Sequence, residues 1–526
     1  MSKATEMGRI SAKGGFHLLW GLILSTIISA IGTIIIARLL GADNFGLYYI
    51  ALAAPALIAN FRDWGVNTAM IKFSAEAHNE NNLGKIRNIF VSGLAFEIIV
   101  GLALAVLSLV LSQFLAEFYG RPAIVQLIQI ASLFILTGAL VNSATAAFTG
   151  LEKMHLNSIM LVIQSIVKTI LIIALVGLGF GTLGAVIGFS LGVLFAGVIG
   201  VLLMYTMYKS LPKVATGKLE LTKTIKIMLK YGLPLSIGGI LYGFLIQFYM
   251  IIMAIFVTDN ALIGNYSVAV SFVVLITFFA APVTTMMFPA FSKLDAVHDK
   301  EVLKNVFQYS VKYASIVVVP ITAMVMALAQ PAIATIFGDQ YVQAPLYLAL
   351  LSVIYLFTAI GSLSAGNLIN GQGFTKYTLK LQLLMVAIGF PLSFVLVSQF
   401  GIIGLIVTTI LVGVPSQFLA LRFIKKKFGV SIDWGSSAKI VFSSSVTAVL
   451  TYAAISQLPF SSPVQLALGV IIFIVAFLVL TVVTRTINKA DLDNIREIVN
   501  ALGPLRKPLN IVLNLIERLM RILKTN

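Results

Sequence analysis

Apolar stretches long enough to cross a lipid bilayer follow one another along most of this 526-residue chain. A transmembrane helix needs about 20 consecutive, mostly apolar residues, and fourteen segments come close to that length. Because every backbone polar group must be paired inside a bilayer, each segment is expected to be helical. The segments are 16–38, 45–61, 88–113, 122–148, 157–177, 182–208, 231–257, 262–290, 305–329, 343–370, 377–398, 402–424, 438–457 and 463–484. The sequence therefore predicts an all-α integral membrane protein with fourteen transmembrane helices.

The composition excludes a water-soluble domain and makes a metal centre improbable. Hydrophobic residues make up 59% of the chain and charged residues only 10%, whereas soluble proteins carry about 25% charge. The chain contains no cysteine, which excludes disulfides and thiolate sites. Its four histidines lie far apart and in no metal-ligand spacing, so no cofactor or metal is expected.

The positive charges alternate with the predicted spans. Of the 36 Lys and Arg residues, thirty-three precede the first span, lie in or flank the even-numbered connections, or follow the last span. Only Arg38 and Arg121 lie on the opposite side, and Lys168 lies within a span. Cytoplasmic loops carry such an excess of basic residues. We therefore expect a multi-pass protein of the cell membrane with both termini in the cytoplasm, in which the net charge of +17 sets orientation and does not indicate nucleic-acid binding.

Two halves of the chain resemble each other at a nearly constant offset. Gly46-Leu47-Tyr48 matches Gly264-Asn265-Tyr266 at an offset of 218, and Phe180-Gly181 matches Phe400-Gly401 at 220. Six predicted spans separate equivalent points, so the copies have the same orientation and form a parallel repeat. Transporters with parallel repeats bind substrate between two lobes and rock one against the other; an inert duplicated scaffold is the other interpretation.

The spans and charges divide the chain into five predicted regions. These are an N-terminal six-helix lobe (1–208), a basic cytoplasmic linker (209–230), a C-terminal six-helix lobe (231–427), two extra helices (428–487) and a cytoplasmic amphipathic tail (488–526). Gly503-Pro504 and Pro508 are expected to break the tail into two amphipathic pieces. Their apolar and basic faces indicate contact with the anionic cytoplasmic leaflet, and a partner-binding helix is the alternative.

Residues around the first two spans resemble those of polysaccharide-exporting flippases. The resemblance rests on Arg38-Leu39-Leu40-Gly41, Phe45-Gly46-x-Tyr48 and Asp63-x-Gly65. Such flippases, including the Wzx-type O-antigen flippases, belong to the multidrug/oligosaccharidyl-lipid/polysaccharide exporter superfamily. The similarity covers nearly the whole chain, and the two extra spans resemble the polysaccharide and lipid II flippase branches rather than the twelve-span multidrug branch.

This resemblance implies a substrate and partners. The substrate would be a polyprenyl-diphosphate-linked oligosaccharide, flipped from the cytoplasmic to the outer leaflet for cell-surface glycan biosynthesis. Membrane lipids would surround the protein, and a glycan polymerase or glycosyltransferases of the same pathway would be further partners. No catalytic residues are expected.

Two charged residues lie well inside predicted spans, where charge is costly and usually functional. Glu97 in the third span and Lys168 in the fifth lie at similar depth. Either they form a buried ion pair that fixes helix packing, or Lys168 contacts the substrate diphosphate and Glu97 is a cation- or proton-coupling site. In the next predicted span, Gly184, Gly188 and Gly192 recur every four residues, a stripe of small residues that predicts close helix packing.

Further candidates for substrate contact lie at span ends and on uncharged positions. Arg62 and Lys72 follow the second span, and the flippase resemblance implies that Arg62 contacts the head group, whereas topology-setting charge is the plain alternative. Arg38 closes the first span, where it would hold a release site or anchor the helix. Asn142 and Gln247 would line a sugar path or bond between helices.

Two other functions remain open alongside flipping, together with a purely structural role. A multidrug antiporter of the same superfamily needs acidic residues in the bundle for ion coupling, and only Glu97 qualifies. A membrane glycosyltransferase or ligase usually carries catalytic carboxylates or histidines on large outer loops. The predicted outer connections are short and poor in such residues, which argues against catalysis.

Overall fold

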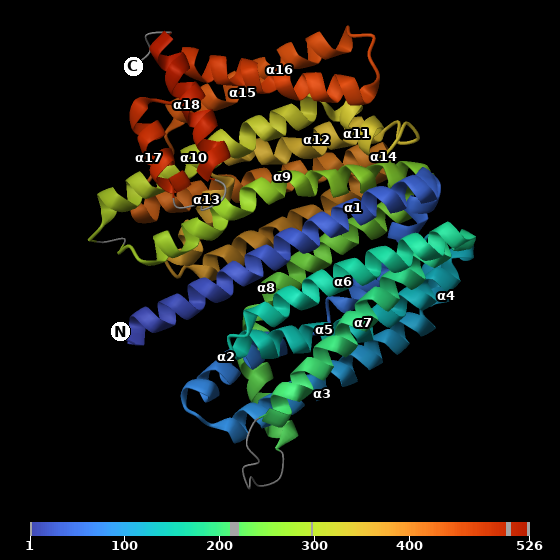
Figure 1. Ribbon diagram of the computed structural model, residues 1–526. Helices are drawn as coiled ribbons and strands as arrows, with labels where there is room; N and C mark the ends of the chain where they lie inside the picture. Colours follow the sequence, from blue (N-terminus) through green and yellow to red (C-terminus); the bar gives the residue numbers. More distant parts are fainter. Residues whose placement is uncertain (1–2, 211–219, 296–297, 501–505, 523–526) are drawn as a thin grey trace. The chain divides into compact units, whose positions relative to one another are not determined.

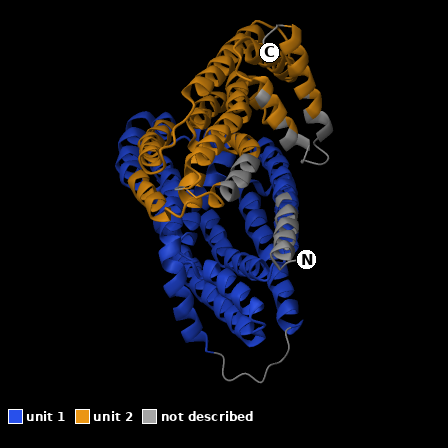
Figure 2. Cartoon of the chain, turned by 90° about the vertical axis from the view of Figure 1, so that its left-hand side faces the viewer, with its two compact units in different colours: residues 1–267, 386–405 blue, residues 268–385, 406–526 orange. Residues whose placement is uncertain are grey.

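The computed structural model describes residues 3–210, 220–295, 298–500 and 506–522, and every regular element in these ranges is a helix (Figure 1). The predicted all-α class is therefore confirmed. The chain divides into two compact units, which are described separately here (Figure 2). Unit 1 comprises residues 1–267 and 386–405, and unit 2 comprises residues 268–385 and 406–526.

The helices of each unit cover the predicted spans, with the first and second spans joined in one helix and the eleventh and twelfth in another. Unit 1 contains α1 (Lys3–Ala59), α2 (Val66–Asn79), α3 (Leu83–Val110), α4 (Ser112–Phe118), η1 (Pro122–Ile124), α5 (Val125–Gly150), α6 (Met154–Leu175), η2 (Val176–Phe180), α7 (Gly181–Ser210), α8 (Leu221–Phe256) and the beginning of α9 (Asn260–Ser292). Unit 2 contains the rest of α9, α10 (Lys300–Ala327), α11 (Ala329–Ile336), α12 (Ala344–Leu356), η3 (Phe357–Ile360), α13 (Ser362–Gly371), α15 (Trp434–Ser456), α16 (Ser462–Val483), α17 (Lys489–Asn500) and α18 (Arg506–Ile522). Helix α14 (Thr375–Phe428) contributes residues to both units.

Ten helices of the described chain are long and apolar enough to cross a membrane, or eleven if the bent pair formed by 344–360 and α13 counts as one span. Three of the ten, Trp20–Ala59, Met154–Ser210 and Thr375–Phe428, have 40, 57 and 54 residues. At 1.5 Å per residue they would measure about 60 to 85 Å, whereas the hydrocarbon core is about 30 Å thick. Each is therefore at least twice as long as one crossing requires.

Glycines with non-helical torsions interrupt these three long helices. Gly41 has φ 75° and ψ 170°, Gly181 has φ 53° and ψ −136°, and Gly401 has φ 56° and ψ −131°. Positive φ is unfavourable for residues that carry a Cβ atom, which explains glycine at each break. Gly181 and Gly401 are the residues matched at an offset of 220 in the sequence, and they adopt nearly the same backbone conformation.

The tenth predicted span, 343–370, is bent by 54° between residues 360 and 362. Gly361 at φ 78° makes the bend. Side chains of neighbouring helices satisfy the carbonyls at the break: Ser315 Oγ donates to the Thr358 carbonyl at 3.1 Å, and Gln417 Nε2 donates to the Ile360 carbonyl at 2.9 Å. Such pairing is what allows irregular backbone at membrane depth.

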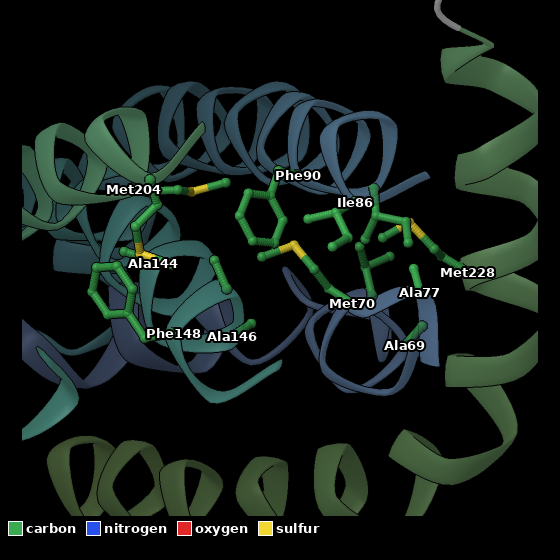
Figure 3. Packing of buried hydrophobic residues seen from close by; sticks show 14 of the residues in the cluster. Ala69, Met70, Ala77, Ile86, Phe90, Ala144, Ala146, Phe148, Met204 and Met228 are labelled. Carbon is green, nitrogen blue, oxygen red and sulfur yellow. The ribbon is translucent and has the colours of Figure 1, made fainter. Parts of the chain in front are cut away.

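A hydrophobic cluster in unit 1 packs α2 against α3, α5, α7 and α8. Figure 3 shows Met70 of α2 beside Ile86 and Phe90 of α3, with Met228 of α8 completing the group. Ile86, Met70 and Met228 are fully buried. Because methionine fills irregular gaps well, these contacts hold the short helix α2 against its longer neighbours and so position the residues that precede it.

The tail after the last span forms two helices, α17 and α18, as predicted. Gly503-Pro504, predicted to separate the two pieces, lies outside the described residues. Pro508 lies in the first turn of α18, where the free N–H groups of a helix start make proline harmless. In unit 2, Lys312 Nζ of α10 lies 2.6 Å from Asp491 Oδ2 of α17. The apolar faces of the tail helices pack in one cluster with α16; its buried members are Val482, Ile487, Leu492, Leu513, Ile516 and Met520. Contact of the tail with a lipid leaflet stays a prediction.

Asp433 caps helix α15, and its removal should destabilise the protein modestly. Its carboxylate accepts the backbone N–H groups of Gly435 at 3.1 Å and Ser436 at 3.2 Å, and the Ser436 hydroxyl bond lowers the pKa of Asp433. We expect Asp433→Ala to lower the free energy of unfolding by about 1 kcal/mol. Because the pKa of Asp433 is lower in the folded than in the unfolded state, the stabilisation is fully present above the unfolded-state pKa of about 3.9. It is lost as the pH falls through the pKa of the folded state.

Thermal unfolding at neutral and at acidic pH measures this effect. The difference between Asp433→Ala and the wild type should shrink at the lower pH, and Asp433→Asn, which keeps an acceptor oxygen, should retain most of the stability at both. Equal melting temperatures for Asp433→Ala and the wild type at neutral pH would contradict the assignment of the cap.

Candidate functional site

A buried ion pair links the end of α1 to the middle of α3. Arg62 Nε donates to Glu97 Oε2 at 2.9 Å, and Arg62 Nη1 donates to the Ile135 carbonyl of α5 at 3.1 Å. Glu97 is fully buried and Arg62 is 7% exposed. A charge removed from water is tolerated only with such partners, so each side chain depends on the other.

The second carboxylate oxygen of Glu97 is held by a residue that sequence reasoning missed. Asn67 Nδ2 donates to Glu97 Oε1 at 2.8 Å. The Asp63 carboxylate accepts the backbone N–H of Asn67 at 2.8 Å, and Gly65 takes φ 82° at the start of α2. The turn that contains Asp63-x-Gly65 thus brings Arg62 and Asn67 to the same carboxylate.

Glycines make the space for this turn and for the guanidinium. A Cβ atom at Gly65 would lie 2.2 Å from the Gly232 carbonyl oxygen, and one at Gly232 would lie 2.0 Å from the Gly65 oxygen. On α5, a Cβ atom at Gly138 would lie 2.9 Å from Arg62 Nη1. The backbone of α8 therefore contacts the α1–α2 turn directly, and Arg62 fits against α5 because that surface lacks a side chain.

A pairing between Glu97 and Lys168, suggested by their similar depth, is wrong. Both Glu97 oxygens are bonded to Arg62 and Asn67, while Lys168 lies on α6 and lines a cavity together with residues of α1 and α7. Depth along a helix does not fix the direction in which a side chain points. Arg62, expected at the end of a span, instead reaches inward to α3 and α5.

The cavity beside Lys168 has a volume of about 150 Å³. Its polar lining includes the hydroxyl-bearing residues Ser29 and Thr33 of α1, and its aromatic lining includes Tyr48, Tyr49 and Phe189. On the other side of α6, a Cβ atom at Gly192 would lie 2.6 Å from Lys168 Cα. The predicted glycine stripe of α7 thus packs against the α6 backbone and holds Lys168 in place.

The remaining predicted residues lie on separate helices. The Lys72 ammonium lies 4.2 Å from the centroid of the Tyr231 ring, a cation–π contact between α2 and α8. Arg38 is exposed on α1, Asn142 is exposed on α5 and Gln247 is partly buried on α8. The ion-pair cluster and the cavity are built from other residues.

The backbones of α1 and α9 approach each other closely at two symmetric points. We call the four residues involved the glycine contact; they are Ala42, Gly46, Asn260 and Gly264. A Cβ atom at Gly46 would lie 2.0 Å from the Asn260 carbonyl oxygen, and one at Gly264 would lie 1.9 Å from the Ala42 carbonyl oxygen. Residues 42 and 46 become 260 and 264 when 218 is added, which is the offset of the sequence repeat. The two halves of this contact are therefore related by the same offset as the matched sequence segments.

Arg121 holds the end of α8 beside the glycine contact. Its guanidinium donates to Asn260 Oδ1 at 2.6 Å and to the carbonyls of Val257 at 2.6 Å, Thr258 at 3.1 Å and Ala254. These carbonyls belong to the C-terminal end of α8, where cations are favourable. In the sequence, Arg121 stood out because basic residues are rare on its predicted side of the membrane. Nothing in the sequence singled out Asn67 in this way.

Comparison with known proteins places the chain among membrane proteins of glycan biosynthesis. The profile of a family described as "Polysaccharide biosynthesis protein" matches residues 35–346. A protein of Methanocaldococcus jannaschii named "Uncharacterized membrane protein MJ1068" is 25% identical over 381 residues, covering 70% of this chain and 74% of that protein. The "Probable low-salt glycan biosynthesis flippase Agl15" of Haloferax volcanii is 20% identical over 272 residues, covering 51% of this chain and 56% of the relative. Together with the ten apolar helices, these relatives confirm a multi-pass membrane protein.

Solved structures share the fold. The lipid II flippase MurJ in an inward closed conformation has a TM-score of 0.70 at 16% identity, covering 89% of this chain and 98% of MurJ. An inward-facing multidrug resistance transporter of the MATE family and the MOP superfamily has a TM-score of 0.62 at 16% identity, covering 76% of this chain and 95% of that one. At these identities the likeness shows the fold alone.

Proposed function

Because the chain belongs to the polysaccharide biosynthesis protein family, we propose that it flips a polyprenyl-diphosphate-linked oligosaccharide from the cytoplasmic to the outer leaflet. The observation that carries this proposal is the family match over residues 35–346 combined with a fold similar to that of a lipid II flippase over 89% of the chain. One relative is itself named a flippase of glycan biosynthesis. The product would serve cell-surface glycan assembly, and the polymerase or glycosyltransferases that use it would be partners.

The proposed architecture has fourteen transmembrane helices in two parallel six-helix repeats, with two extra helices and cytoplasmic termini. Breaks at Gly41, Gly181 and Gly401 support the count, since they divide three helices that are too long for one crossing. The equal torsions of Gly181 and Gly401 and the reciprocal glycine contact support the repeat. Two such repeats would work by alternating access, as parallel-repeat transporters do.

The candidate residues take different roles in this proposal. Lys168, with its cavity in the membrane-spanning part of unit 1, is the substrate contact best supported by geometry. Arg62 holds Glu97 and so organises the turn that precedes α2, the helix that carries Lys72. Lys72 and Arg38 are exposed and would meet anionic head groups. Further polar candidates for the sugar path are Asn142 and Gln247.

A second candidate, an ion-coupled antiporter, is favoured by the fold of the MATE transporters. It would use Glu97 as its coupling site. In the structure both oxygens of Glu97 are bonded to Arg62 and Asn67, so ion binding would require this cluster to open. Because of this requirement, we favour the flippase over the antiporter.

Reconstitution tests the flippase directly. Full-length protein in vesicles should speed the exposure of a fluorescent polyprenyl-diphosphate disaccharide at the far leaflet at least about tenfold, which corresponds to a barrier lowered by about 1.4 kcal/mol. A membrane-impermeant reductant that bleaches only exposed probe measures the rate. Empty vesicles and a fluorescent phosphatidylcholine probe are the controls for leakage.

The same vesicles separate the two candidates. Acceleration of the disaccharide probe without dependence on a sodium or proton gradient supports the flippase. Export of a cationic dye driven by such a gradient, with no acceleration of the disaccharide probe, would replace it with the antiporter.

A further inference from the structure

The cavity beside Lys168 is lined by a cation for which the described residues supply no counter-charge. Lys168 is partly buried and no described residue forms an ion pair with its ammonium, whereas the fully buried Glu97 is paired with Arg62. A lysine at this depth is costly when it stands alone. Lys168 lies fourteen residues into α6, about 21 Å from the helix start. An anion brought by a ligand would supply the missing charge.

Hydroxyl-bearing residues line the same cavity as Lys168 and extend its polar surface. The Thr169 hydroxyl is buried without a hydrogen-bond partner in the described chain, and Ser29 Oγ of α1 lies 3.1 Å from Ser165 Oγ of α6. Buried polar groups are almost always satisfied in native proteins. An oxygen-rich ligand would satisfy the groups that face the cavity.

Aromatic residues form another part of the cavity lining. The Tyr48 ring centroid lies 5.4 Å from that of Tyr49 and 6.5 Å from that of Phe189, in edge-to-face geometry, and Phe45 lies 5.1 Å from Tyr49. The negative face of an aromatic ring attracts the positive edge of C–H bonds. A sugar ring has such C–H faces together with hydroxyl groups, so it matches both parts of the lining.

The volume of the cavity and the single charge of Lys168 further restrict the kind of ligand that fits. The volume of about 150 Å³ is small, which suits a single small ring or an anionic group. One ammonium balances one negative charge, as on a carboxylate, and would leave one of the two negative charges of the linking diphosphate uncompensated. The cavity therefore fits a sugar that bears one carboxylate.

We propose that the Lys168 cavity is a subsite for an acidic sugar of the transported glycan, with the carboxylate on Lys168 and the ring against Tyr48, Tyr49 and Phe189. This proposal rests on the proposed function and adds the substrate class, a glycan that contains a uronic acid. It also sets a direction of selectivity: acidic glycans are flipped faster than neutral glycans of equal length.

The test compares two probes that differ in one sugar. Full-length protein in vesicles receives fluorescent polyprenyl-diphosphate disaccharides that end in glucuronic acid or in glucose. Lys168→Gln should slow the glucuronic acid probe at least about tenfold, as expected for loss of a charge-assisted contact, and change the glucose probe little. Lys168→Arg should retain the preference. Lys153→Gln, at the exposed start of the same helix, is the matched control and should behave as the wild type.

A second variant and a binding measurement keep the proposal testable if Lys168→Gln fails to accumulate. Thr33→Phe fills the cavity from α1 while leaving Lys168 in place, and it should remove the preference for the glucuronic acid probe. Methyl glucuronide, but not methyl glucoside, should raise the melting temperature of the wild type, because a ligand that binds the folded state stabilises it. The cavity-filled variant should show no such shift.

The outcomes separate this proposal from the proposed function. Equal slowing of both probes by Lys168→Gln would assign the lysine to the diphosphate common to both and overturn the acidic-sugar subsite. Unchanged rates in Lys168→Gln and Thr33→Phe would overturn it as well. If the wild type flips neither probe, the proposed function fails, and the melting-temperature shift alone decides whether the cavity binds an acidic sugar.

Discussion

Replacing Glu97 with glutamine should lower the free energy of unfolding by about 3–5 kcal/mol, the usual cost of removing one partner of a buried ion pair. The substitution keeps the size of the side chain but leaves the guanidinium of Arg62 buried without its charge partner, 2.9 Å from the substituted group. Thermal unfolding of the purified protein measures the loss, and the amount of protein in the membrane should fall with it.

A matched exposed pair is the control. Lys85 Nζ and Glu80 Oε2 lie 3.3 Å apart, but the side chains are 39% and 49% exposed, so Glu80→Gln should cost less than about 1 kcal/mol. The double variant Arg62→Met with Glu97→Met should recover much of the stability lost in Glu97→Gln, because apolar groups can replace a buried pair. Stability of Glu97→Gln equal to that of Glu80→Gln would show that the pair does not hold the helices.

The double variant also distinguishes packing from transport. If it is stable and flips the disaccharide probe as fast as the wild type, the pair serves packing alone. If it is stable and inactive, the charges themselves take part in transport, as the antiporter candidate requires of Glu97.

Gly264→Ala should disrupt the glycine contact and stop flipping. The added Cβ atom would lie 1.9 Å from the Ala42 carbonyl oxygen, a separation that forces the two backbones apart. Overpacking of this kind costs about 3 kcal/mol or more where backbone must move. Gly46→Ala, with its Cβ atom 2.0 Å from the Asn260 oxygen, should have the same effect, which melting temperature and flipping rate together will measure.

Gly239 on α8 is the control glycine for this experiment. A Cβ atom there would meet nothing within 4 Å, so Gly239→Ala should be neutral or stabilise the helix by up to about 1 kcal/mol. A Gly264→Ala protein that melts and flips like Gly239→Ala would show that close backbone contact is dispensable.

The positions of helices could be predicted from the sequence because the bilayer imposes a length and a pattern of charge. The apolar runs and the basic loops located most helices to within a few residues, and the glycines of the repeat marked the breaks at Gly181 and Gly401. The sequence did not predict the bend at Gly361, since the run 343–370 contains no charged residue that would divide it. Side chains from other helices, Ser315 and Gln417, satisfy its carbonyls, and distant partners of this kind leave no local signal.

The candidate site was only partly predictable. Charge inside an apolar span singled out Glu97 and Lys168, which are the centres of the ion-pair cluster and of the cavity. Their partners depend on which helix faces which, and a depth estimate cannot supply that. Asn67 in particular reaches Glu97 only because Gly65 adopts a left-handed conformation and the chain turns at that point.

The glycine contact constrains how such a chain can evolve. In this contact, residue 42 meets residue 264 and residue 46 meets residue 260, and these pairs are exchanged by the offset of 218. A two-fold dimer interface has the same self-complementary form. A half-length ancestor with this surface would have met a second copy of itself through a single glycine position. Once the copies are joined in one chain, Gly46 and Gly264 mutate independently, yet each must still accommodate the other copy's carbonyl. Losing either glycine spoils a surface that both halves share, so selection acts on the two positions together although 217 residues separate them in the chain.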